Sequence, residues 1–332
     1  MSKVDKILKS VNPHTTLDTL ELTSEIFKGK SHETLYSSAF RKYKTNEKVK
    51  ALFDVSNNKI YWKTWHCNNV LLQQGQTLKG SLCRKRWCNH CNRIRTAELI
   101  KGYQQPLKDL SKEDKLYLVT LTAPTVKARQ LKSEVEKRYQ AWVRVKDRLR
   151  KQGVSLNGTR KLEIEYNIEM DWFHPHFHFV CQGKRESELL LSYWLDEFKN
   201  ASIKAQHITE VGTKAKDLME VFKYATKDIV TDETTAKATH IIYSVLKGRK
   251  IFQTFGKLKK VKQPKKEITQ SIKYKWLNPN DYEIWIYDQD LKDYEGSYGK
   301  VLIGSNYISN ELTQLRHYGS NSKRKKRLSN ST

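Results

Sequence analysis

The sequence contains no long hydrophobic run and few acidic residues for its size. None of the apolar stretches in its 332 residues reaches the roughly 18 to 20 residues that a membrane-spanning helix needs. The first residues, MSKVDKILKSVNPH, also lack the apolar segment of a secretory signal. With 38% hydrophobic and 30% charged residues, the composition is typical of a soluble globular chain. We therefore expect a cytoplasmic protein that does not bind a membrane.

Acidic residues are outnumbered, since 36 Asp and Glu stand against 62 Lys and Arg and leave a formal net charge of +26. Such an excess of one sign opposes compaction and attracts a polyanion. The 17 Tyr and eight Trp residues offer rings on which bases can stack. Binding to a membrane surface is the alternative, but we find no basic amphipathic helix to support it. The composition favours nucleic acid as the partner.

Cysteine is scarce, and the five thiols of a cytosolic chain indicate metal or redox chemistry rather than disulfides. Four of them follow the spacing C-x15-C-x4-C-x2-C, and we expect them to hold a structural zinc ion: Cys67, Cys83, Cys88 and Cys91. His66 or His90 could replace one of these cysteines, and ordinary reduced thiols near a loop are the alternative. Cys181 is expected to be a small buried residue.

Basic residues lie between and after these cysteines. We expect the zinc-bound loop to present five of them to DNA: Arg84, Lys85, Arg86, Arg93 and Arg95. In this interpretation the zinc ion stabilises the loop and is distinct from any catalytic metal.

From residue 116 the predicted elements follow the order strand, helix, strand, strand, helix, strand, helix. Alternating apolar residues predict strands over 116–123, 160–168, 174–181 and 204–211. Apolar residues spaced by three and four predict helices over 131–149, 189–198 and 215–228. The short connection between the second and third strands implies antiparallel pairing. We expect an α+β fold of the ferredoxin-like kind, with an antiparallel sheet flanked by helices.

We divide the chain into four segments. They are an N-terminal region without an assigned role, a Cys-rich module, the α+β core and a C-terminal region: 1–59, 60–105, 106–262 and 263–332. The last stretch, YGSNSKRKKRLSNST, is polar and charged, and we expect it to be disordered. No internal repeat is found.

The stretch FHPHFHFV places three imidazoles at alternate positions of a predicted strand, so His174, His176 and His178 share one face. Three interpretations compete: histidines satisfied by hydrogen bonds, the signature of histidine-triad nucleotide hydrolases, and a metal site. Glu163 and Glu165 lie two residues apart on the neighbouring strand, and a carboxylate beside two imidazoles suits Mn²⁺ or Mg²⁺. A histidine-triad hydrolase needs no such carboxylate, so the metal site is favoured.

In the segment DLMEVFKYATKD (217–228), Glu220, Tyr224 and Lys227 are spaced by four and three and share one helical stripe. An exposed, salt-bridged helix face is the simplest interpretation of this spacing. A lysine near a tyrosine also favours the phenolate, which is a nucleophile.

Five stretches, taken together, resemble the replication initiators (Rep) of small rolling-circle plasmids, which belong to the HUH endonuclease superfamily. LVTLTAP (118–124) resembles the first family motif, KLEIEYN with HPHFHFV (161–180) the second and VFKYATKD (221–228) the third. The flanking stretches IIYSVLKGRKIFQTFGKLKK (241–260) and CRKRWCNHCNRIR (83–95) also resemble family segments. The resemblance covers about residues 65–260.

The resemblance implies an RRM-like HUH nickase core and a role for each matching residue. His176 and His178 would bind Mn²⁺ or Mg²⁺, with Glu163 as the third ligand and Glu165 or His174 as alternatives. Tyr224 would attack a DNA phosphodiester and form a 5′-phosphotyrosine, while Lys227 assists. Glu220 would activate the water that ends the cycle. The expected partners are the double-strand origin, single-stranded DNA, and a host helicase and polymerase.

Two other functions remain open from the sequence. An HUH relaxase or transposase would use the same chemistry, although those proteins usually place the tyrosine before the histidines or carry paired tyrosines. A zinc-containing DNA-binding regulator would have no enzymatic activity, and its binding would survive the loss of His176 and His178.

Overall fold

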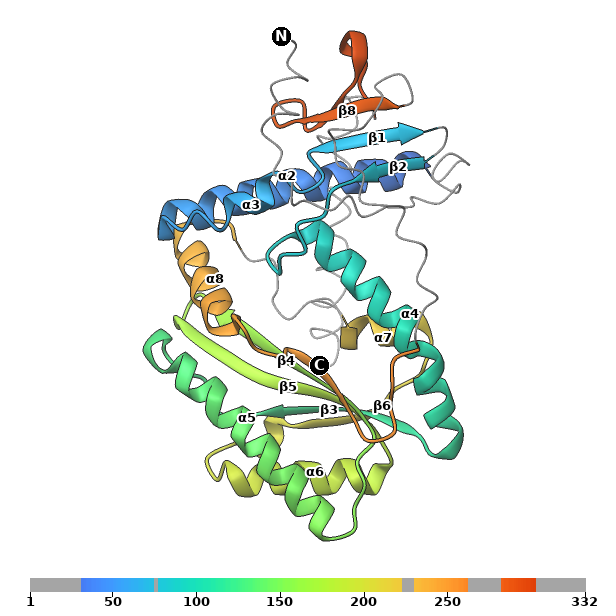
Figure 1. Ribbon diagram of the computed structural model, residues 1–332. Helices are drawn as coiled ribbons and strands as arrows, with labels where there is room; N and C mark the ends of the chain where they lie inside the picture. The colour runs from blue at the N-terminus through green and yellow to red at the C-terminus, as the bar shows by residue number, and fades with distance from the viewer. Residues whose placement is uncertain (1–30, 75–76, 223–229, 262–281, 303–332) are drawn as a thin grey trace, which may run out of the picture.

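A computed structural model describes residues 31–74, 77–222, 230–261 and 282–302. These residues form a mixed α and β structure with two antiparallel sheets (Figure 1). None of the helices in the described ranges combines the length and the apolar character that crossing a bilayer requires.

A five-stranded sheet with the order β6-β3-β5-β4-β7 forms the centre of the lower part of the molecule in Figure 1. Its strands are β3 (Leu116–Thr122), β4 (Gly158–Asn167), β5 (Trp172–Gln182), β6 (His207–Glu210) and β7 (Phe252–Phe255). All neighbouring strands are antiparallel, and β4 and β5 form a hairpin whose register pairs Glu163 with His176. The hairpin confirms the antiparallel pairing expected from the short connection.

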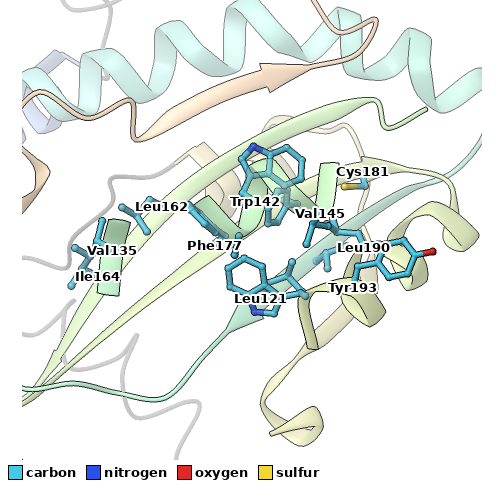
Figure 2. Packing of buried hydrophobic residues seen from close by; sticks show 14 of the residues in the cluster. Leu121, Val135, Trp142, Val145, Leu162, Ile164, Phe177, Cys181, Leu190 and Tyr193 are labelled. Atoms are coloured by element: carbon cyan, nitrogen blue, oxygen red, sulfur yellow. The ribbon is translucent and has the colours of Figure 1, made fainter. Parts of the chain in front are cut away.

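Helices α5 (Ala128–Lys151) and α6 (Lys184–Glu197) cover one face of this sheet, below it in Figure 1. Alternate residues of β5 point to this face, and Phe177 and Phe179 are fully buried there. Figure 2 shows Phe177 and Trp142 packed among aliphatic side chains of the strands and helices. Cys181 belongs to the same cluster and is buried, as the sequence predicts.

The opposite face carries the histidines and is flanked by α4 (Asn89–Glu113) and α7 (Ala215–Phe222) (Figure 1). Val180 of β5 packs on this side against Leu107 of α4 and Leu218 of α7. Because Val180 and the histidines alternate with the buried phenylalanines, α7 and the imidazoles lie on the same side of the sheet. Helix α8 (Glu233–Leu246) then leads through a turn into β7.

A second sheet of order β2-β1-β8-β9 lies with α2 (Ser31–Ser56) and α3 (Trp62–Trp65) in the upper part of Figure 1. Its strands are β1 (Val70–Gln74), β2 (Thr77–Gly80), β8 (Glu283–Asp288) and β9 (Asp293–Glu295). Thus β1, from the expected Cys-rich module, pairs with β8, from the expected C-terminal region.

The predicted order of elements from residue 116 onward matches β3-α5-β4-β5-α6-β6-α7. Several boundaries were wrong: residues 203–205 form a 3-10 turn instead of the start of a strand, and α5 and α6 begin three and five residues earlier than predicted. The expected helix 215–228 is seen as far as Phe222, and its remainder lies outside the described residues. The boundary drawn at 105/106 falls inside α4.

Candidate active site

Three neighbouring strands bring the candidate residues into register on the face covered by α4 and α7. In the β4–β5 pair, His176 lies opposite Glu163 and His178 opposite Lys161. In the β3–β5 pair, His178 lies opposite Thr120. Each of these residues alternates with a core residue, so the antiparallel register alone gathers their side chains on one face.

Glu163, His176 and His178 offer ligand atoms that all lie within 4.8 Å of one another. The two Nε2 atoms of the histidines are 3.0 Å apart, and Nε2 of His178 is 3.3 Å from Oε2 of Glu163. Within the described part of the chain, these three side chains form a group that could hold a metal ion, and they are the residues expected as ligands from the sequence.

The hydrogen bonds of the two Nδ1 atoms determine whether each Nε2 atom carries a proton or a lone pair. Nδ1 of His176 donates to the carbonyl of His174 (3.0 Å), so Nε2 of the neutral ring carries a lone pair. Nδ1 of His178 lies 3.0 Å from the Thr120 hydroxyl. When both rings are neutral with their protons on Nδ1, two lone pairs and a carboxylate converge. Such a cluster is stable only around a cation or a shared proton.

The pKa values of His176 and Glu163 favour, at neutral pH, the protonation states that bind a metal ion. Burial, followed by the charge of His178, lowers the pKa of His176 to about 4, so this ring is neutral. Burial alone would raise the pKa of Glu163. In the cation-free protein, where Nε2 of His178 can carry the proton and donate to Glu163, this hydrogen bond and the charge of Lys161, whose Nζ lies 3.0 Å from Oε2, outweigh burial and hold that pKa at about 2. Neutral nitrogen and ionised carboxylate are the states that bind a divalent cation.

His174 and Glu165, the alternative ligands, occupy the next register position. His174 is paired with Glu165 across the strands, and its ring stacks on His176 with centroids 4.9 Å apart. The carbonyl of His174 also accepts from His176, so this residue orients the His176 ring. The group of three described above does not include either alternative.

The residues expected to act from the helix are described only in part. Glu220 belongs to α7, but its side chain is outside the described residues, as are Tyr224 and Lys227 altogether. The described apolar residues Leu218, Val221 and Phe222 pack with the histidine-bearing side of the sheet. The described part of α7, which precedes Tyr224 in the sequence, therefore packs on the same side of the sheet as the imidazoles.

The four cysteines predicted to bind zinc come together below β1. The sulfur of Cys67 lies 3.5 Å from that of Cys91 and 3.6 Å from that of Cys88, while Cys83 and Cys91 are 3.7 Å apart. A tetrahedral zinc ion with Zn–S bonds of about 2.3 Å would hold sulfurs about 3.8 Å apart. All four thiols are free, and their sulfurs lie within 4.8 Å of one another. The donor set therefore fits a structural zinc ion.

Backbone groups complete this cluster. The N–H of Cys91 donates to the Cys88 sulfur (3.4 Å), which caps α4, and the N–H of Arg84 donates to the Cys91 sulfur (3.3 Å). Such donors stabilise thiolates. His90 is engaged elsewhere, since its ring lies within hydrogen-bond distance of Ser38 and Asn68. Neither His90 nor His66 belongs to the group of four sulfurs.

Lys42 of α2 is a charged neighbour of the cysteines that the sequence analysis missed. It is fully buried and donates to the carbonyl of Trp65. Burial lowers its pKa to about 8, against the opposing influence of Cys67, Cys88 and Cys83. The amine is still protonated at neutral pH and offsets the negative charge of the thiolates. A lysine at a buried position of a helix gives no sequence signal, because only the fold brings it to the cysteines.

The five basic residues expected to contact DNA differ in their surroundings. Arg84 and Arg93 are exposed and Lys85 is half-buried. Arg86 donates to the carbonyls of Leu246 (2.6 Å) and Arg249 (2.8 Å), so it also fixes the turn after α8. Arg95 donates to the carbonyl of Arg84.

Comparison with known proteins gives a family. The family described as "Replication protein" matches residues 74–283. The protein named "Protein rep" from Staphylococcus aureus is 30% identical over 185 residues, which are 49% of this chain and 80% of that protein. No solved structure matches the chain. The match spans both the cysteines from Cys83 onward and the histidine strand. The chain therefore belongs to the replication protein (Rep) family, the plasmid replication initiators that its motifs resemble.

Proposed function

We propose that the protein initiates rolling-circle replication of a plasmid by nicking one strand of the origin and holding the new 5′ end on Tyr224. The observation that supports this most is the convergence of Glu163, His176 and His178 within 4.8 Å on the side of the sheet where α7 packs, the helix that precedes Tyr224 in the sequence. Membership of the replication protein family agrees with this role.

Glu163, His176 and His178 would hold Mn²⁺ or Mg²⁺. A divalent ion there polarises a phosphate oxygen and stabilises charge in phosphoryl transfer. Two neutral nitrogens and one carboxylate leave further coordination positions open, as a catalytic site requires. Lys161 keeps Glu163 ionised, and the Thr120 hydroxyl and the His174 carbonyl fix the orientation of the rings.

The covalent step uses the tyrosine as the nucleophile. The Tyr224 oxygen loses its proton and attacks the phosphorus, a Tyr–O–P bond forms, and the 3′ oxygen leaves as a hydroxyl that a polymerase extends. Lys227 would favour the phenolate. Because the tyrosyl ester preserves the energy of the broken bond, the strand can be transferred back later. Glu220 would activate a water molecule that ends the cycle by hydrolysis.

The topology supports an HUH core of the ferredoxin and RRM-like kind. Strands β3, β4, β5 and β6 follow a β-α-β-β-α-β order, and the two central strands are β3 and β5. The zinc-bound cysteines would secure α4 beside this core. The basic residues Arg84, Lys85 and Arg93 would contact the origin, and a host helicase would open the duplex in the cytoplasm.

Covalent capture of DNA tests the proposal. The wild-type protein should nick a single-stranded oligonucleotide of the plasmid origin only with added Mn²⁺ or Mg²⁺, and mass spectrometry should find the DNA on the peptide that contains Tyr224. Tyr224→Phe should abolish the adduct, while Tyr298→Phe, at a tyrosine that is 99% exposed, should retain it. An undiminished adduct in Tyr224→Phe would remove Tyr224 from the mechanism. Origin binding that survives His176→Ala with no cleavage under any condition would instead favour a regulator.

A further inference from the structure

A cavity of about 480 Å³ opens beside the candidate metal site. It lies between α4, the last residue described in α7, strand β4 and the turn that leads into β7. Its basic lining residues are Arg86, Arg95, Lys161, Arg249 and Lys250. Its apolar lining residues are Leu99, Phe222, Ile251 and Phe252. Among the described residues that line it, none is acidic, so the cavity suits an anionic ligand with a flat apolar part.

The turn that forms one wall is fixed in place. Arg86 donates to the carbonyls of Leu246 and Arg249 at the two ends of this turn. Between them, Gly248 adopts a φ of 75°, a conformation that favours glycine. The carbonyl of Ile251 accepts from the N–H of Leu162, which ties the turn to β4. The basic side chains of the turn are thus presented by a rigid backbone, which lowers the entropic cost of binding.

The aromatic wall is equally constrained. Phe222 and Phe252 contact each other with ring centroids 5.4 Å apart. The hydroxyl of Thr96, also in the lining, donates to the carbonyl of Phe222 and fixes the end of α7 against α4. Phe222 is buried, whereas Phe252 is half-buried and can offer part of its ring to a ligand.

Two residues connect the cavity with the proposed chemistry. Lys161 lines it, and the Nζ atom of Lys161 is 3.0 Å from Oε2 of the metal ligand Glu163. Phe222 lines it too and precedes Tyr224 by two positions. A molecule in the cavity would therefore lie next to Lys161, which contacts Glu163, and next to the last described residue of α7.

We propose that this cavity binds one unpaired nucleotide of the origin strand beside the scissile phosphate. The base lies against Phe252 and Leu99, and the phosphate faces the exposed amine of Lys250, because the guanidinium groups of Arg86 and Arg249 already bind backbone carbonyls and Glu136. The volume suits a nucleotide, because ligand pockets span about 300 to 1,000 Å³. Stacking on a ring tolerates every base, whereas inorganic phosphate alone would leave the apolar wall unused. This inference rests on the proposed nickase function.

Photocrosslinking tests the cavity without cleavage. The probe is a dodecathymidylate that carries one 4-thiothymidine, mixed with Tyr224→Phe protein and no added divalent cation. We expect the crosslinked peptides to be those that contain Phe222 or residues 249–252. Crosslinks spread evenly over the basic surface would overturn the proposal.

Matched variants in the same Tyr224→Phe background measure affinity for the unmodified dodecathymidylate by fluorescence anisotropy. Phe252→Leu and Lys250→Ala should each raise Kd about five-fold or more. The controls are Phe53→Leu, a half-buried phenylalanine of α2, and Lys247→Ala, an exposed lysine outside the lining; both should change Kd less than two-fold, roughly the scatter of such measurements. Thermal melting checks that each variant is folded. Equal changes in Kd in the variants and the controls would also reject the cavity as the nucleotide-binding site.

The outcomes separate this inference from the proposed function. Crosslinks in the cavity without any nicking by the wild-type protein would reject the nickase and retain the nucleotide site. A tyrosine adduct without crosslinks in the cavity would reject the nucleotide site and retain the nickase.

Discussion

At the scale of single residues, the candidate metal site depends on groups that do not touch the metal. Thr120 and the His174 carbonyl lie behind the two imidazoles and direct both Nε2 atoms toward Glu163. Lys161 adds a positive charge 3.0 Å from the same carboxylate. Such partners typically change metal affinity by about 10- to 100-fold.

Thr120→Val should therefore weaken Mn²⁺ binding about ten-fold, because it removes the hydroxyl next to His178 and keeps the shape of the side chain. Free Mn²⁺ measured by electron paramagnetic resonance gives the affinity. Thr209→Val, at an exposed position of β6, is the control and should bind Mn²⁺ like the wild type. If the two variants behave alike, Thr120 does not orient the ligand.

His176 should titrate with a pKa of about 4 in the cation-free protein, because burial and the neighbouring His178 disfavour its charged form. The facing groups are His174, His178 and Glu163, and the last acts in the opposite direction. Since the unfolded ring binds its proton near pH 6.5, stability should fall as the pH drops from about 6.5 toward 4. NMR of the imidazole carbon-bound protons measures the midpoint. A midpoint near 6.5 would contradict the prediction.

At the scale of secondary-structure elements, the cysteines determine where α4 begins. Cys88 caps the helix and Cys91 lies in its first turn, so a zinc ion would join this helix to Cys67 and Cys83. Arg95 and Thr96 follow in the next turn and line the basic cavity. The cysteine cluster and the cavity wall therefore share one helix.

We expect one zinc ion per chain in the purified protein, and its loss together with a lower melting temperature in Cys91→Ser. Atomic absorption measures the metal, and differential scanning fluorimetry measures the melting temperature. Cys181→Ala also removes a buried thiol, but this thiol lies in the core of the sheet and the zinc content should stay at one. A zinc-free wild-type protein, purified without chelator, would rule out the structural zinc ion.

Core packing sets the stability of the sheet. Phe177→Ala should lower the free energy of unfolding by about 3–5 kcal/mol, because the fully buried ring leaves a cavity between β5, Tyr139 and Trp194. Val143→Ala, at a side chain that is 49% exposed, should change it by less than about 0.5 kcal/mol. Urea denaturation monitored by circular dichroism compares the two, and equal midpoints would contradict this account of the core.

Four of the five strands of the large sheet were predictable from the sequence because apolar residues alternate along them, and α5 and α6 because theirs repeat every three to four residues; the short edge strand β7 was not predicted. Helix α4 was missed, since it starts within the cysteine motif and carries Pro106 inside, which normally argues against a helix. Strands β8 and β9 were missed because β8 pairs with β1, far away in the sequence, and β9 has only three residues. The position of Lys42 beside the cysteines and the basic cavity could not be predicted either, because both depend on contacts between residues that are distant in the sequence.

For the whole molecule, the formal net charge of +26 attracts polyanions, and DNA is the polyanion that we propose as the partner. We expect Kd for a duplex to rise by about 10³- to 10⁵-fold between 50 and 200 mM salt if the protein neutralises about six to ten phosphates. Fluorescence anisotropy at several salt concentrations gives the slope. An affinity that does not change with salt would show that the charge excess does not drive binding.

Strand β1 has β2 on one side and β8 on the other, and the partner residues Val70 and Ile286 come from opposite parts of the chain. A growing polypeptide leaves the ribosome in sequence order. All strands of the five-stranded sheet are therefore present once Phe255 has emerged, whereas β8, the partner of β1, has not yet emerged. During that interval, Leu71 and Leu72 of β1 lack their partner residues Trp285 and Ile284 of β8. Translation that stops between β7 and β8 would therefore produce a chain with all strands of the five-stranded sheet and an open, aggregation-prone edge at β1.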